Sequence, residues 1–184
     1  MDNENQRVKL TKRLLREALI SLLEEKQIQQ ISVRELCEKA EINRSTFYKH
    51  YGAPENILQE IQQELITNII SLAEDNGSPV GMRLYLERIC EFLWNGRALH
   101  RVLLSSQTGS EDMDLFRMTS NAMWNVKTFR QDVRPLDPLT DQAAMLFVES
   151  GCYSVFRWWL LDDIDKTPKE IAALLCRLIG LKDE

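Results

Sequence analysis

The sequence predicts an all-α protein, and three observations support that prediction. Hydrophobic residues recur at the three- and four-residue spacing of helices along nearly the whole chain. The helix formers Leu, Glu, Arg, Lys and Gln are plentiful, whereas the 184 residues include only seven Gly and five Pro. Turn-rich segments such as residues 75–79 separate the periodic stretches. A chain of this length forms one domain or two small ones.

The first predicted helix packs against two shorter helices that are joined by a tight turn. Its apolar stripe consists of Leu10, Leu14, Ala18 and Leu22. Ser32 is a favourable N-cap for the next helix, and Glu35 is placed to complete a capping box. Residues 41–43 form the turn, and Asn43 caps the following helix. This is the geometry of a helix-turn-helix, whose second helix enters the DNA major groove.

Six side chains of that second helix are candidate DNA contacts. They are Arg44, Ser45, Thr46, Tyr48, Lys49 and His50. The arginine can donate two hydrogen bonds to a guanine edge, and the two hydroxyl residues can bond a base or contact a thymine methyl group. The last three are better placed for phosphates, which position a protein without specifying sequence. Ordinary helix-N-terminal chemistry is the alternative for the two hydroxyl residues, and Phe47 and Tyr51 are expected to pack into the core.

Residues 14–58 resemble the DNA-binding domain of the TetR family of bacterial transcriptional regulators. The matching features are a long amphipathic first helix, the segment I-S-V-R-E-L, the turn A-E-I-N, the helix S-T-F-Y-K-H-Y and a fourth helix starting near Pro54. The resemblance implies that residues at the positions of Thr46, Tyr48 and His50 touch DNA. Where the family often carries a phosphate-binding Lys, this chain has Pro54, which suits the first turn of a helix. The amides of that helix N-terminus can still face a phosphate.

Basic charge is concentrated in the predicted DNA-binding part. The whole chain has a formal net charge of −5, but residues 1–53 contain ten Lys or Arg and eight Asp or Glu, which gives +2. The remainder contains thirteen basic and twenty acidic residues, which gives −7. A basic run near the N-terminus adds Arg7, Lys9, Lys12, Arg13 and Arg16. A local basic face attracts phosphates, while the acidic remainder limits indiscriminate binding.

Beyond residue 53, helical periodicity predicts a second, C-terminal domain of helices. We therefore divide the chain into a helix-turn-helix domain, residues 1–53, and a helical bundle domain, residues 54–184. The predicted helices cover residues 54–73, 82–104 with a break at Asn95-Gly96, 112–133, 138–161 and 168–181. The first of them begins in the DNA-binding part and runs away from it, so it is the natural mechanical connection between the two domains.

The helix predicted for residues 138–161 indicates a dimer. It is apolar almost all round, so we expect its own core and a partner subunit to bury it. Gly151 permits close approach of a second backbone, and Phe156, Trp158 and Trp159 supply large apolar area. The segments L-Y-L-E-R-I-C-E-F-L-W and V-F-R-W-W-L also resemble a TetR C-terminal domain. In that family, the last two long helices commonly form a four-helix dimer interface.

The sequence contains no motif of an enzyme or of a metal site. It has two His and no Gly-rich phosphate loop, G-x-S-x-G or H-E-x-x-H, so we expect no catalytic residues. The four cysteines lack metal-ligand spacing, so we expect reduced, buried thiols and no metal or cofactor; they are Cys37, Cys90, Cys152 and Cys176. No apolar run is long enough to span a bilayer and no signal peptide is visible. We expect a cytoplasmic protein without a membrane partner.

We interpret the chain as a repressor that binds double-stranded DNA as a homodimer on a near-palindromic operator. The resemblance implies an effector cavity, and large apolar residues are available to line it, although core packing is favoured for each: Tyr85, Trp94, Met113, Phe116, Met123 and Trp124. His100, Arg97 and Arg101 either grip an anion or form a solvated charged face, and the second is favoured. No effector-binding residue is assigned. The alternative is a regulator whose C-terminal domain docks a protein partner, such as a coactivator or adaptor, instead of a small molecule.

Overall fold

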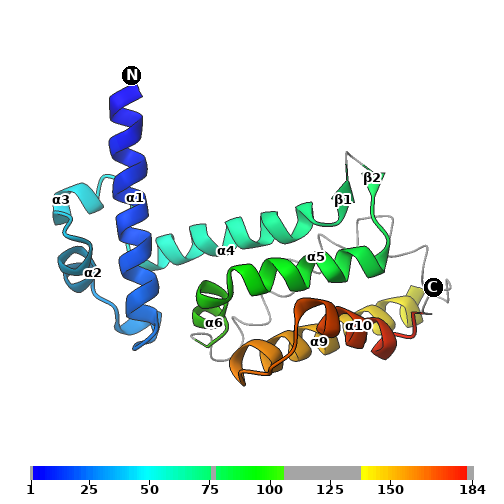
Figure 1. The fold of residues 1–184 in the computed structure, drawn as a ribbon. Helices are drawn as coiled ribbons and strands as arrows, with labels where there is room; N and C mark the ends of the chain where they lie inside the picture. The colour runs from blue at the N-terminus through cyan, green and yellow to red at the C-terminus, as the bar shows by residue number, and fades with distance from the viewer. Residues whose placement is uncertain (1, 76–77, 106–137, 182–184) are drawn as a thin grey trace. The chain divides into compact units, whose positions relative to one another are not determined.

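The computed structural model of the chain describes residues 2–75, 78–105 and 138–181 (Figure 1). The described residues are mostly helical, as the sequence predicts. They form two compact units, each with its own core: the first extends to Leu65, and the second comprises Ile66–Leu104 and the helices after residue 137. The predicted division after residue 53 stays a prediction.

The first unit consists of three helices, one short 3-10 turn and the beginning of a fourth helix. These elements are α1 (Asp2–Leu23), η1 (Ile28–Gln30), α2 (Val33–Ala40), α3 (Arg44–Phe47) and α4 (Pro54–Ser71). The buried apolar side chains of this unit are Leu15, Ala18, Leu19, Leu22, Leu23, Ile28, Ile31, Leu36, Cys37, Ala40, Phe47, Tyr51, Ile57, Leu58 and Ile61. The first half of α4 thus contributes to the core of the helix-turn-helix unit.

Two local predictions in this unit need correction. Ala18 and Leu22 are buried as predicted, but Leu10 is 47% exposed. At the start of α2, the Ser32 hydroxyl accepts a hydrogen bond from the Glu35 amide at 3.2 Å. The Glu35 carboxylate does not complete the capping box, because it forms an ion pair with Lys26.

The turn between α2 and α3 depends on a left-handed residue. Glu41 has φ +56°, and its amide lies 3.3 Å from the Glu38 carbonyl, while the Ile42 amide donates to the Cys37 carbonyl at 3.0 Å. Such a pair of bonds around a left-handed residue satisfies the last carbonyls of a helix and reverses the chain. The A-E-I-N segment therefore ends α2 sharply, as the sequence predicts.

The second unit contains the end of α4, a small hairpin and four described helices. They are β1 (Glu74–Asp75), β2 (Ser78–Pro79), α5 (Met82–Asn95), α6 (Arg97–Ser105), α9 (Pro138–Leu161) and α10 (Pro168–Leu178). The predicted break at Asn95-Gly96 and the predicted bounds 138–161 are confirmed, whereas the last helix ends earlier than residue 181. The hairpin pairs Glu74 with Pro79 and Asp75 with Ser78 where only a turn was predicted. The predicted helix 112–133 lies outside the described residues.

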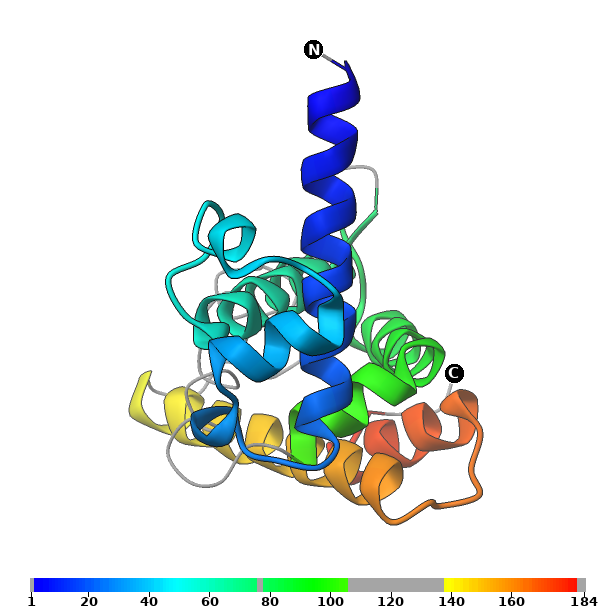
Figure 2. The same ribbon diagram turned by 90° about the vertical axis from the view of Figure 1, so that its left-hand side faces the viewer.

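Helix α10 lies along α5 and contacts α9 (Figures 1 and 2). The fully buried side chains between these helices include Tyr85, Cys90, Trp159, Ile171 and Leu175. Trp159, expected at the dimer interface, is 1% exposed within its own subunit and stacks on Trp94 with ring centroids 5.2 Å apart. Its indole N–H donates to the Lys166 carbonyl at 2.9 Å. Trp158, the residue before it, is 43% exposed.

The glycine at the break between α5 and α6 lies against a buried side chain. A Cβ atom at Gly96 would lie 2.6 Å from Cε1 of His100, so the imidazole ring fills the space that a side chain at residue 96 needs. His100 Nδ1 lies 2.9 Å from the Leu93 carbonyl, to which it donates, and the ring also contacts Phe92. The predicted solvated face at His100 is therefore wrong: the side chain is buried, and burial lowers its pKa despite the bond to Leu93.

Candidate nucleic-acid interface

Residues 44–50, hereafter the recognition segment, begin as an α-helix and end as a tighter turn. The α-helix covers only Arg44–Phe47, so it is shorter than predicted. After it, the Lys49 amide donates to the Thr46 carbonyl at 3.2 Å and the His50 amide to the Phe47 carbonyl at 2.9 Å. Bonds between residues three apart wind the chain more tightly than an α-helix does.

The recognition segment presents a mostly exposed face. Arg44, Ser45, Tyr48 and Lys49 are exposed, with Tyr48 at 60%, and the other two candidate contacts, Thr46 and His50, are half-buried. Phe47 is fully buried and Tyr51 nearly so, as predicted, and their rings lie 6.0 Å apart. The segment is thus attached to the unit by aromatic side chains on one side and offers hydrogen-bonding side chains on the other.

The cap of this segment differs from the prediction. Asn43 occupies the N-cap position, and its backbone carbonyl accepts from the amides of Thr46 at 2.9 Å and Phe47 at 3.0 Å. Its side chain makes no capping hydrogen bond, although it is exposed. The side chain of Asn43 is therefore part of the polar surface around the recognition segment and does not cap the helix.

Positive charge at the recognition segment is available to a ligand. Among the described residues, Arg44, Lys49 and the nearby Lys39 form no ion pair. The basic run of α1 is different, because three of its five cations are engaged within the unit: Lys12 with Glu60, Arg13 with Glu17 and Arg16 with Glu64. The predicted N-terminal basic face is correspondingly reduced to Arg7 and Lys9.

The start of α4 also has its amides largely satisfied. Asn56 accepts hydrogen bonds from the amides of Gly52 at 3.2 Å and Ala53 at 3.0 Å, and its own amide donates to the Ala53 carbonyl at 3.1 Å. Pro54 has no amide hydrogen to offer. The helix N-terminus considered as a phosphate contact therefore has fewer free donors than the sequence suggested.

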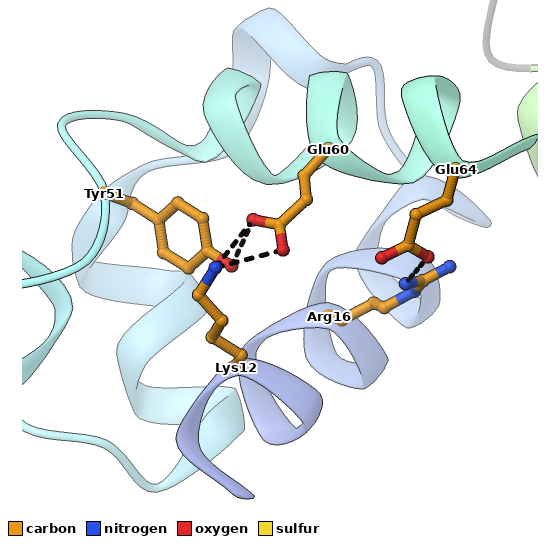
Figure 3. A network of polar contacts seen from close by, with 5 residues as sticks. All are labelled: Lys12, Arg16, Tyr51, Glu60 and Glu64. Carbon is orange, nitrogen blue, oxygen red and sulfur yellow. Dashed lines mark hydrogen bonds and ion pairs between the residues drawn. The ribbon is translucent and has the colours of Figure 1, made fainter. Parts of the chain in front are cut away.

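A polar cluster that sequence reasoning missed lies behind the recognition segment (Figure 3). The Tyr51 hydroxyl donates to Glu60 Oε2 at 2.8 Å, and Lys12 Nζ lies 3.0 Å from Glu60 Oε1. Lys12 Nζ is also 5.3 Å from the centre of the Tyr51 ring. One helical turn further along both helices, Arg16 pairs with Glu64. The signal in the sequence was two basic residues four apart in one helix and two acidic residues four apart in another.

The contacts in this cluster lower the pKa of Glu60 and raise the pKa of Tyr51. Burial opposes ionisation of Glu60, but hydrogen bonds from Tyr51 and Lys12 outweigh it and lower the pKa of that carboxyl. Burial raises the pKa of the Tyr51 hydroxyl, and the Glu60 carboxylate raises it further. Tyr51 is consequently a neutral donor and Glu60 an ionised acceptor.

Several of the residues considered for an effector site make contacts with other side chains. Tyr85 is buried in the core of the second unit. Trp94 stacks on Trp159, and the Arg97 guanidinium lies 4.9 Å from the centre of the Trp94 ring. Arg101 pairs with Asp163. Met113, Phe116, Met123 and Trp124 lie outside the described residues.

The described cysteines are free thiols, as predicted, and Cys37, Cys90 and Cys176 are buried. Burial raises the pKa of Cys90 to about 12 and that of Cys152 to about 11. Within the described ranges, no group of three or more His, Cys, Asp or Glu side chains is arranged to hold a metal ion. Among the same residues, no helix is both long enough and apolar enough to cross a membrane.

The C-terminal helices carry the signature that decides the family. The model of a TetR C-terminal domain, described as "Transcriptional regulator C-terminal region", matches residues 82–180. The chain belongs to the TetR family. It is thus a transcriptional regulator, and this family favours a regulatory role over catalysis. No curated protein is a significant match to the sequence.

Solved structures share the fold over nearly the whole chain. A TetR transcriptional regulator from Streptococcus agalactiae 2603V is 21% identical, with a TM-score of 0.76 that covers 96% of this chain and 97% of that one. The dihydroxyacetone kinase operon activator DhaS is 15% identical, with a TM-score of 0.64 over 92% of this chain and 93% of that one. A TetR regulator from Rhodococcus sp. RHA1 is 16% identical, with a TM-score of 0.57 over 97% and 100%. At these identities, the likeness concerns the fold.

Proposed function

We propose that this TetR-family regulator binds operator DNA through its recognition segment. The observation that supports the proposal best is the exposed, unpaired Arg44 and Lys49 on a segment whose opposite side is buried by Phe47. Arg44, with Ser45 and Thr46, lies at the leading end, where a helix entering the major groove meets base edges. Tyr48, Lys49 and His50 follow and contact phosphates.

The regulator acts as a homodimer through α9 and α10. Small and apolar side chains form an exposed stripe along α9: Ala143, Phe147, Gly151, Ser154 and Trp158. Phe147 is 78% exposed, and Leu178 at the end of α10 is 62% exposed. An apolar stripe of this length on a soluble regulator is characteristic of an interface. Two-fold symmetry then places the two recognition segments on half-sites about one helical turn apart, or a small multiple of it, in a near-palindromic operator. The regulator does this in the cytoplasm.

Repression follows from occupation of a promoter, and an effector relieves it. An effector acts by stabilising a dimer whose recognition segments do not match the groove spacing, and α4 carries the change because it continues from the first unit into the second. The coupling equals the difference between the effector's affinities for the two states. The alternative is a second domain that docks a protein partner, and activation is consistent with the likeness to DhaS, which is an operon activator.

Equilibrium binding to a duplex selected from a random library tests the DNA-binding roles. Arg44→Ala costs about 1–3 kcal/mol of specific binding and relaxes one base preference, because a base contact is lost. Lys49→Ala weakens all duplexes similarly and lowers the salt slope by about one. Lys169→Ala, which removes one exposed positive charge from α10, is the control for net charge. An unchanged sequence preference in Arg44→Ala removes that residue from the reading role.

Sedimentation velocity tests the dimer. Trp158→Asp places a charge in the proposed interface and yields monomers, whereas Leu84→Asp leaves the dimer intact. Leu84 is a matched control, because it is 41% exposed but belongs to α5. A dimer that survives Trp158→Asp excludes this stripe from the interface.

Size-exclusion chromatography with cell extract separates the two effector hypotheses. A protein partner co-elutes with the regulator in fixed stoichiometry, while a metabolite leaves its elution volume unchanged and shifts its thermal unfolding instead.

A further inference from the structure

Of the seven residues of the recognition segment, four are exposed, two are half-buried and one is buried. Its α-helix is four residues long, it lacks a side-chain cap, and Phe47 is its one buried side chain among residues 44–50. The residue that follows it directly is Tyr51, whose amide donates to the Phe47 carbonyl at 2.9 Å. The orientation of the segment therefore depends strongly on what holds Tyr51.

Tyr51 is held by two other elements at once. Its hydroxyl donates to Glu60 on α4 at 2.8 Å, and its ring lies beneath Lys12 of α1, which itself binds both carboxylate oxygens of Glu60 at 3.0 and 3.1 Å (Figure 3). Each of the three side chains contacts the other two. Hydrogen bonds to an ionised acceptor are stronger than those between neutral groups, so this is a firm attachment.

We propose that Tyr51 and Glu60 are positioning residues for DNA reading: their hydrogen bond fixes the C-terminal end of the recognition segment on α4. This inference rests on the proposed DNA-binding function. The hydrogen bond between Tyr51 and Glu60 is the contact through which α4 influences DNA reading. Base contacts require side chains placed within a fraction of an ångström, whereas phosphate contacts tolerate more variation. Loss of the bond therefore lowers the fraction of molecules that are ready to read bases, and the apparent affinity falls by that fraction.

Glu60 and its neighbour Glu64 on α4 differ in their contacts with Tyr51. Glu64 lies one turn further along α4 and pairs with Arg16. The Tyr51 hydroxyl donates to Glu60 and not to Glu64, which acts on Tyr51 through its charge alone by raising the pKa of that hydroxyl. Both carboxylates link α1 to α4 in the same way, and only Glu60 reaches the end of the recognition segment. Glu64 is thus the matched control for charge, helix and partner type.

The test measures the ratio of specific to nonspecific DNA binding, together with thermal unfolding, in the full-length protein. The specific probe is a duplex selected with the wild type, and the nonspecific probe is a scrambled duplex of equal length. Tyr51→Phe removes one hydroxyl without changing charge, and we expect the ratio to fall about tenfold. Glu60→Ala lowers the ratio similarly, the double variant adds little to either single change, and Glu60→Gln, which still accepts from Tyr51, retains most of it.

The ratio separates positioning from simple destabilisation. A variant that is merely less folded loses both kinds of binding equally, so its ratio does not change. An unchanged ratio in Tyr51→Phe and Glu60→Ala overturns the inference, as does an equal fall in Glu64→Ala. If the wild type itself shows no preference for any duplex, the proposed function fails and the inference fails with it.

Discussion

The two short helices α3 and α10 are held in the protein in opposite ways. Helix α10 has eleven residues, a complete capping box between Thr167 and Glu170, and four buried side chains packed mainly on α5. Helix α3 has four residues, no side-chain cap, and Phe47 as its buried side chain. Stability of α10 comes from its own cap and from four buried side chains, whereas α3 relies on one buried side chain, Phe47, and on the residues that flank it. A segment that meets an external ligand must leave its polar side chains uncommitted, and it therefore depends on its flanks.

Phe47→Ala, in α3, is expected to give the largest loss of stability. It removes the fully buried ring that attaches α3, so we expect a loss of about 3–5 kcal/mol in the free energy of unfolding. Urea unfolding followed by circular dichroism measures it. A cost below about 1 kcal/mol would mean that α3 is held by contacts other than Phe47.

Leu175→Ala is the counterpart in α10. This side chain is 1% exposed, and its truncation leaves a cavity that costs about 2–5 kcal/mol. We expect the first unit to keep its DNA-binding ability while the second unit unfolds more easily, which hydrogen exchange resolves helix by helix. Uniform loss of protection in both units would show that they unfold as one and would weaken the comparison.

The caps give a smaller and more selective contrast. Thr167→Ala removes a hydroxyl that accepts from the Glu170 amide at 3.3 Å, and we expect a loss of about 1 kcal/mol in stability. Asn43→Ala is expected to cost only a few tenths of a kcal/mol, because the Asn43 side chain makes no capping bond. The two values come from thermal unfolding under identical conditions. Equal costs would contradict the assignment of Asn43 to the polar surface.

The smallest expected effect is a change in stability with pH in the acidic range. The hydrogen bond from Lys166, followed by those from the Thr167 amide and hydroxyl, lowers the pKa of Glu170 from 4.5 to about 2. A carboxyl whose pKa is lower in the folded state stabilises the protein above its unfolded pKa, and that contribution is lost as pH falls from about 4.5 towards 2. Glu170→Gln should therefore be less stable than the wild type at pH 6, with the gap closing in that window. A gap that does not change with pH would exclude the carboxylate as its cause.

The sequence predicted several elements well from local signals. The break at Asn95-Gly96 and the bounds of the 138–161 helix follow from Gly, Pro and apolar spacing, and the structure confirms them. The burial of Phe47 followed from its place inside a helix-turn-helix. These features depend on residues that are close along the chain.

Features that depend on distant residues were harder to predict. Trp158 and Trp159 are adjacent and chemically identical, yet one is exposed and the other stacks on Trp94, which comes from a different helix, α5. The charges near His100 suggested a solvated face, but the imidazole fills the space above Gly96. Glu60 had no motif to mark it, since its partners Lys12 and Tyr51 come from other elements.

Selection of bound duplexes from a random DNA library at near-physiological salt tests whether the recognition segment reads DNA. We expect enrichment of an inverted repeat with half-sites about one helical turn apart or a small multiple of it, and loss of one base preference per half-site in Arg44→Ala. Failure of the folded wild-type protein to enrich any sequence would contradict that role.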